Sequence, residues 1–197
     1  GRELAAAGDA RLGYSDPESR PLNDRCLATG GRTGPPMVNG LYNNHYQIVQ
    51  TPEHVMIHTE MISHARVIPL RSAHTTPATQ PLFGDSIASW QGDTLVIETT
   101  NFSPYHSWQD HPAYLSPDAK VTERFSRVAD DELLYEFTVD DPAYYAQPWS
   151  GEVTWRRDDE RIHEFACHEG NYSMEGILMG ARVREKRGEV LEEANEE

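Results

Sequence analysis

From residue 45 onward, apolar and polar residues alternate with a period of two, and this pattern limits the fold more than any other feature. Successive side chains of a β-strand point to opposite faces of a sheet, so the pattern indicates strands with one buried face. The segment 133–140 is the clearest case. Its apolar face carries Leu133, Tyr135, Phe137 and Val139.

Turn-forming residues such as Gln91-Gly92-Asp93 separate the alternating segments. Nine strands are expected, at 46–51, 54–61, 65–70, 87–90, 94–101, 121–128, 133–140, 152–157 and 161–167. Short connections favour an antiparallel meander, and closure into a barrel removes its exposed edges. We therefore predict an all-β fold, a single antiparallel β-barrel with a lipocalin-like meander of about 8–10 strands.

A length of 197 residues is typical of one domain. We expect an N-terminal arm over 1–44 that contains a short helix at 3–12, the barrel over 45–173, and a C-terminal helix with an acidic tail over 174–197. The loop 103–119 is long, which is typical of a lid or a binding loop. Its aromatic and imidazole side chains are His106, Trp108, His111 and Tyr114.

The chain is strongly acidic, with 17 basic and 32 acidic residues, a net charge of -15 and a pI near 4.9. Such a charge repels phosphate backbones and anionic lipid surfaces, so we expect neither a nucleic acid nor a membrane as a partner. A small molecule is the expected partner. The long arm can wrap a neighbouring copy as readily as its own barrel, so a homodimer stays open.

Cys26 and Cys167 are the two cysteines of the chain. They can form one disulfide in an oxidising compartment or stay as two buried thiols, and the sequence leaves both open. Two thiols do not complete a four-cysteine zinc site. The first residue is Gly1 rather than Met, so we expect a processed or trimmed chain.

The densest polar cluster is 54–61, in which His58 and Glu60 stand two residues apart. On a strand they share one face, opposite Val55 and Ile57. A His beside a carboxylate suits general acid or base catalysis near neutral pH, and the same pair can bind zinc, iron or manganese. The alternative is an ordinary polar patch on the wet face of the sheet.

A second cluster, at the end of the ninth expected strand, contains His168 and Glu169. At a barrel mouth they could meet His58 and Glu60, and supply the second half of an acid–base pair or a third metal ligand. The alternative is turn chemistry, since Gly170 follows directly.

A third group mixes cationic, acidic and aromatic side chains, which suits binding of a polar organic substrate with an apolar face, such as a sugar. We assign substrate binding to Arg66, Glu123, Arg124, Tyr135 and Trp155. The alternative is an aromatic core with ion pairs outside it. The chain lacks the glycine-rich phosphate-binding motifs, so we expect no nucleotide cofactor, and a divalent metal stays open.

The chain from Cys26 to about Arg182 resembles a family of uncharacterised, exported proteins of soil bacteria. Matching segments are 44–52, 65–70, 90–96, 123–125, 135–142 and 166–172. The resemblance implies a periplasmic or secreted protein and brings no established activity. Members of the family read Ile-His-Asp where this chain has Ile62-Ser63-His64, so we assign no role to His64.

These observations lead to one main functional hypothesis and two alternatives. The first is an exported enzyme that catalyses a lyase, isomerase or hydrolase step on a small polar, carbohydrate-derived molecule. His58 with Glu60 would be the base and His168 with Glu169 the acid. One alternative is a lipocalin-like protein that binds a small ligand without converting it. The other is a metalloenzyme with His58, Glu60 and His168 as ligands, joined by His45 or His74.

Overall fold

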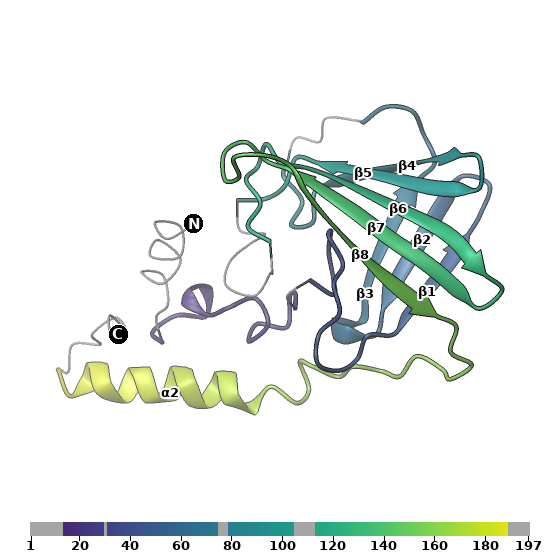
Figure 1. The fold of residues 1–197 in the computed structure, drawn as a ribbon. Coiled ribbons are helices and arrows are strands. Elements are labelled where there is room, and N and C mark those ends of the chain that lie inside the picture. Colours follow the sequence, from purple (N-terminus) through teal and green to yellow (C-terminus); the bar gives the residue numbers. More distant parts are fainter. Residues whose placement is uncertain (1–13, 30, 75–78, 105–112, 189–197) are drawn as a thin grey trace.

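The structure, a computed structural model, describes residues 14–29, 31–74, 79–104 and 113–188. It is mostly β, with two antiparallel sheets and one C-terminal helix (Figure 1). The helix expected at 3–12, the acidic tail from 189, and His106, Trp108 and His111 of the long loop lie outside the described residues.

The first sheet has three strands in the order β1-β2-β3. They are β1 (Tyr46–Gln50), β2 (His54–Thr59) and β3 (His64–Pro69), and the short 3-10 helix η2 (Met61–Ser63) joins the last two. The burial of β2 follows the predicted alternation, because Val55, Ile57 and Thr59 are at most 1% exposed.

The second sheet is a five-stranded meander in the order β4-β5-β6-β7-β8. Its strands are β4 (Asp85–Gln91), β5 (Thr94–Thr100), β6 (Lys120–Ala129), β7 (Glu132–Asp140) and β8 (Trp149–Arg156). The predicted tight turn joins β4 to β5, where Gly92 takes a φ of 61° that a side chain would disfavour. The apolar face predicted for 133–140 is the buried face of β7.

The strands do not close into the single barrel that the sequence predicts. Among the described residues, one isolated bridge joins the sheets, between Leu70 and Ala88, and it is parallel. The chain therefore enters β4 in the same direction as it leaves β3, and an antiparallel ladder cannot continue from one sheet to the next. At the other side, β1 and β8 are edge strands with one neighbour each.

The ninth expected strand, 161–167, is also absent. Two contacts draw this segment away from β8. The backbone N–H of His163 donates to Glu60 Oε2 at 2.9 Å. Cys167 is bonded to Cys26 in the arm. A segment fixed at these two points does not lie along the edge of β8, so the alternation of its residues has no sheet to follow.

The hydrophobic core lies between the two sheets, which face each other in Figure 1. Val55, Ile57 and Ile68 from the first sheet meet the buried face of β5 to β7 from the second. The arm contributes Met37, which is fully buried in the same core. The arm is thus part of the packing that holds the sheets together.

The C-terminal helix α2 (Tyr172–Lys186) extends away from both sheets (Figure 1). Asn171 caps its first turn by accepting from the backbone N–H of Met174. Ala181 is its one buried residue, and Arg182 pairs with Asp16, just before the 3-10 helix η1 (Pro17–Ser19). Within the described residues, no helix is both long and apolar enough to span a membrane.

The disulfide alternative is confirmed for the two cysteines. Cys26 and Cys167 are bonded across a sequence separation of 141 residues. The bond ties the arm to the segment before α2, two regions that share no β-ladder. It is consistent with an oxidising, extracytoplasmic compartment.

Replacing both cysteines with serine is expected to lower the free energy of unfolding by about 2–5 kcal/mol, because a long closed loop restricts the unfolded chain. Urea denaturation of the oxidised wild type and of Cys26→Ser/Cys167→Ser measures the difference. Equal free energies of unfolding would show that the bond contributes nothing to the fold.

Candidate functional site

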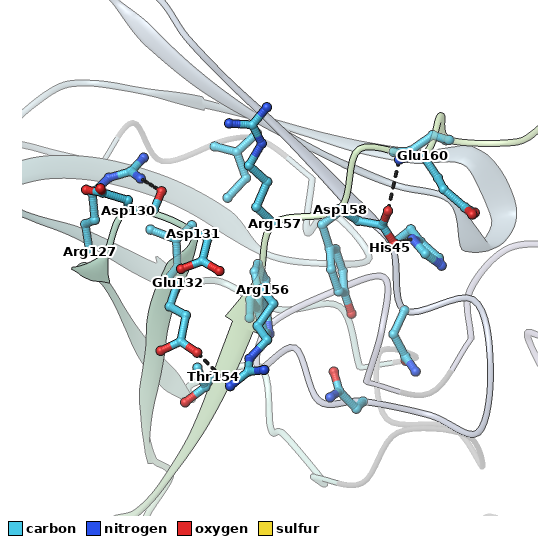
Figure 2. Close-up of a pocket in the computed structure, with 17 residues that line it drawn as sticks. His45, Arg127, Asp130, Asp131, Glu132, Thr154, Arg156, Arg157, Asp158 and Glu160 are labelled. Atoms are coloured by element: carbon cyan, nitrogen blue, oxygen red, sulfur yellow. Dashed lines mark hydrogen bonds and ion pairs between the residues drawn. The ribbon is translucent and has the colours of Figure 1, made fainter.

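A cleft with a volume of about 510 Å³ lies between the open edges of β1 and β8, and Figure 2 draws the residues that line it. The two edges supply opposite walls, and the β6–β7 turn closes one end. Seventeen residues line it: Asn39, Asn44, His45, Tyr46, Ile48, Arg127, Asp130, Asp131, Glu132, Leu133, Thr154, Trp155, Arg156, Arg157, Asp158, Glu160 and Ile162.

A smaller cavity of about 290 Å³ continues the cleft towards the β4–β5 turn. The two share Ile48, Arg127 and Leu133. The walls of the smaller cavity are mostly apolar, with Ile57 and Phe125 at the core side. Together the two cavities form a groove that is polar at its outer end and apolar at its inner end.

Three aromatic rings stack from the core to the cleft. Tyr135 is fully buried, and its ring lies 5.1 Å from that of Trp155. Trp155 in turn stacks on Tyr46 at 4.4 Å with an interplanar angle of 1°. Since Trp155 comes from β8 and Tyr46 from β1, the stack bridges the open edges without a backbone ladder.

Two polar atoms of this stack are buried. Tyr46 Oη and Trp155 Nε1 are buried and have no hydrogen-bond partner among the described residues. Burial raises the pKa of Tyr46 to about 12, against a smaller opposing effect of Arg32, so the phenol keeps its proton at neutral pH. An unpaired buried donor is costly, and a ligand that accepts from these atoms would remove that cost.

The rim of the cleft is charged, as Figure 2 shows. Arg156 pairs with Glu132 at 2.9 Å, and His45 approaches Asp158 at 3.8 Å. Arg127 donates to the backbone oxygen of Asp130 at 2.8 Å. Three arginines and five carboxylates line the cleft, so negative charge is in excess.

Behind the cleft, a buried ion pair joins the two sheets. Arg66 of β3 donates to both oxygens of Glu123 of β6, at 2.6 and 3.1 Å. Tyr135 Oη donates to the same carboxylate at 2.9 Å and accepts from the backbone N–H of Met37 at 2.7 Å. Glu123 is 0% exposed, so these contacts replace its hydration.

The charges of this network are fixed by the environment. Burial disfavours the charge of Arg66, but the adjacent Glu123 carboxylate outweighs that effect and raises the pKa of Arg66. Burial, reinforced by the Glu123 charge, holds the pKa of Tyr135 well above its usual value. Arg66 is therefore a guanidinium and Tyr135 a protonated phenol at neutral pH.

The predicted substrate-binding residues divide among three environments. Arg66, Glu123 and Tyr135 form the buried network, and Trp155 lines the cleft. Arg124 lies on the outer face of the sheet, where it donates to Gln91 at 3.2 Å.

The predicted catalytic residues do not gather at the cleft. His58 lies on the face of β2 opposite the core, and Glu60 follows the strand with an αR backbone and accepts from the N–H of His163. His168 and Glu169 are exposed in a turn. No three His, Cys, Asp or Glu side chains within the described residues are placed to hold a metal ion. The structure thus does not assemble the site expected from His58, Glu60 and His168.

Several residues of the cleft were not singled out by the sequence. Tyr46 and Ile48 line it from β1. Their alternation with Gln47 was the available signal, because it places both side chains on the inner face. Arg127, Arg156 and Arg157 gave no such signal, because their position depends on where the second sheet ends.

His64 belongs neither to the predicted catalytic residues nor to the predicted substrate-binding residues. It begins β3, and its ring lies 4.4 Å from that of Phe83. Burial lowers the pKa of His64 to about 4, with further lowering by the charges of Arg66 and His58. Its Nε2 is buried without a hydrogen-bond partner in the described part of the chain.

Comparison with models of protein families finds no match to this chain. Searches among functionally described proteins and among solved structures likewise find none.

Removing the carboxylate of the buried network should destabilise the fold strongly. Glu123→Ala leaves Arg66 charged and unpaired in the core, so we expect a loss of about 3–5 kcal/mol in the free energy of unfolding. The double variant Arg66→Met/Glu123→Leu removes both charges and should recover most of that loss. Chemical denaturation of the three proteins tests this, and a double variant no more stable than Glu123→Ala would contradict it.

His64 should make stability depend on pH in a defined window. Its pKa is about 4 in the folded protein and near 6.5 when unfolded, so between these values the unfolded chain binds the extra proton. The contribution of neutral His64 is therefore complete above pH 6.5 and is lost as the pH falls towards 4, by at most about 3 kcal/mol. Unfolding free energies of wild type and His64→Phe from pH 4 to 7 check this. If the unfolding free energies of the two proteins changed in parallel with pH, the prediction for His64 would be contradicted.

Proposed function

We propose that this protein is an exported binding protein whose ligand occupies the cleft between β1 and β8. The ligand is a small organic molecule with a flat apolar ring and a neutral or positively charged polar group. The observation that carries the proposal is a pair of buried atoms without a hydrogen-bond partner in the described part of the chain, Tyr46 Oη and Trp155 Nε1, whose residues both line this cleft.

The dimensions of the cleft support a small ligand. Its volume of about 510 Å³ lies within the range of known ligand pockets, which is roughly 300–1,000 Å³. The apolar inner cavity beyond Ile48 and Leu133 suits a hydrocarbon ring, and the charged rim suits a polar end. Such a division of apolar body and polar tip is usual in small-molecule sites.

The charge of the cleft favours ligands that are not anions. Carboxylates outnumber guanidinium groups in its lining, and the whole chain carries a net charge of -15. Both repel a negatively charged ligand at a distance. A protonated amine can pair with the rim carboxylates, and a hydroxyl can hydrogen-bond to them.

Binding is better supported than the acid–base catalysis expected from the sequence. The imidazole in the cleft lining is that of His45, which lies beside Asp158 at the rim. The predicted acid–base residues His58, Glu60, His168 and Glu169 are not part of that lining. In this proposal the protein is a small-molecule carrier whose two sheets leave an open cleft between β1 and β8. The disulfide and the resemblance to an exported family support a periplasmic or secreted location.

Three phenols that differ in one end group test the proposal by isothermal titration calorimetry. They are tyramine, which carries an ammonium, tyrosol, which carries a hydroxyl, and 4-hydroxyphenylacetate, which carries a carboxylate. We expect saturable binding of tyramine and tyrosol, and binding of 4-hydroxyphenylacetate at least tenfold weaker, because the cleft repels its charge. If the carboxylate binds most tightly, or none of the three binds, the proposal fails.

Tyr46→Phe removes one hydroxyl and leaves the ring stack in place. Loss of one hydrogen bond of about 1 kcal/mol weakens binding of tyramine roughly fivefold. Tyr42→Phe, at an exposed position outside the cleft lining, is the matched control and should bind as the wild type does. Equal affinities for all three proteins would remove Tyr46 from the site.

A further inference from the structure

A cavity separate from the cleft and from its smaller apolar extension lies on the opposite side of the fold, along the seam between β3 and β4. Its volume is about 270 Å³, and it shares no lining residue with the cleft between β1 and β8. The lining combines β3 with the segment that leads into β4. These residues are His64, Arg66, Val67, Ile68, Pro69, Pro81, Leu82, Phe83, Gly84, Asp85 and Ser86.

Two buried nitrogen atoms of the lining residues have no partner among the described residues. They are His64 Nε2 and Arg66 Nε. Arg66 is only 6% exposed, and its two terminal nitrogens are already engaged by Glu123. Arg66 Nε is therefore a fixed donor. His64 Nε2 donates or accepts according to the tautomer of the neutral ring.

The charges around the cavity balance. Arg66 is neutralised by Glu123. Asp85 is paired with Arg71 at 3.3 Å and with His74 Nδ1 at 2.8 Å. The ring of His64 is uncharged at neutral pH, because its pKa is about 4. A site with unpaired hydrogen-bonding atoms and no excess charge favours a neutral polar ligand over an ion.

We propose that this cavity is a second binding site, which takes a small neutral hydroxycarbonyl compound. The carbonyl oxygen accepts from Arg66 Nε, and a hydroxyl group hydrogen-bonds to His64 Nε2. The ring of Phe83 and the side chain of Val67 cover its carbon atoms. The site is independent of the ligand proposed for the cleft.

The test uses dihydroxyacetone as the probe and the backbone amide NMR signals of Gly84 and Ser86 as the readout. We expect saturable shifts of these signals, and no saturable shift with acetate, which is of similar size but charged. No saturable response to dihydroxyacetone, or an equal response to acetate, would overturn the proposal.

His64→Phe separates a binding role from a structural one. The substitution keeps a flat ring against Phe83 and removes the unpartnered nitrogen, so it should weaken binding at least tenfold while raising the midpoint of thermal unfolding. His168→Phe, in an exposed turn, is the matched control and should leave binding unchanged. A lowered midpoint for His64→Phe would mean that the nitrogen serves the fold, and would overturn the proposal.

A second variant leaves the buried polar side chains of His64 and Arg66 unchanged. Val67 is 63% exposed at the edge of the cavity, and Val67→Phe adds bulk there. The variant should fold as the wild type does and bind dihydroxyacetone at least tenfold more weakly. Unchanged affinity in this variant would place the ligand elsewhere.

Discussion

The bidentate pair between Arg66 and Glu123 is the contact on which the rest of the structure depends. It joins β3 to β6, two strands from different sheets that are 57 residues apart in sequence. Tyr135 adds β7, and the N–H of Met37 adds the arm. A buried carboxylate is costly unless its oxygens are engaged. Burial of the Glu123 carboxylate therefore requires β3, β6, β7 and the arm to be in place together.

The position of this pair explains why the fold is open on one side. The sheets are joined in the core by the ion pair between β3 and β6, and along one seam by the bridge between Leu70 and Ala88. At β1 and β8, by contrast, the contact is a ring stack between Tyr46 and Trp155. Side chains hold these edges at a distance that leaves a cleft. The aromatic stack then connects this cleft to Tyr135 and so to the buried pair.

Local alternation predicted eight strands and, for β2 and β7, the inner face, because side-chain parity within a strand is a local property. The same parity separates Glu123, which points into the core, from Arg124, which points out. Sheet closure was not predictable in this way, because it depends on the direction in which the chain enters β4 after a long loop. The alternation in 161–167 predicts a strand, but Glu60 accepts from the backbone N–H of His163 and the disulfide fixes Cys167. Both partners are distant in sequence, so no local pattern reveals them.

The central claim is that β1 and β8 are open edges that flank a ligand cleft, and amide hydrogen exchange followed by NMR tests it most directly. The N–H groups of β1 and β8 that do not bond to β2 or β7 should exchange orders of magnitude faster than those of β6 and β7, which have a neighbour on each side. Protection of the β1 and β8 amides equal to that of β6 and β7 would mean that these edges pair in solution, and would contradict the account.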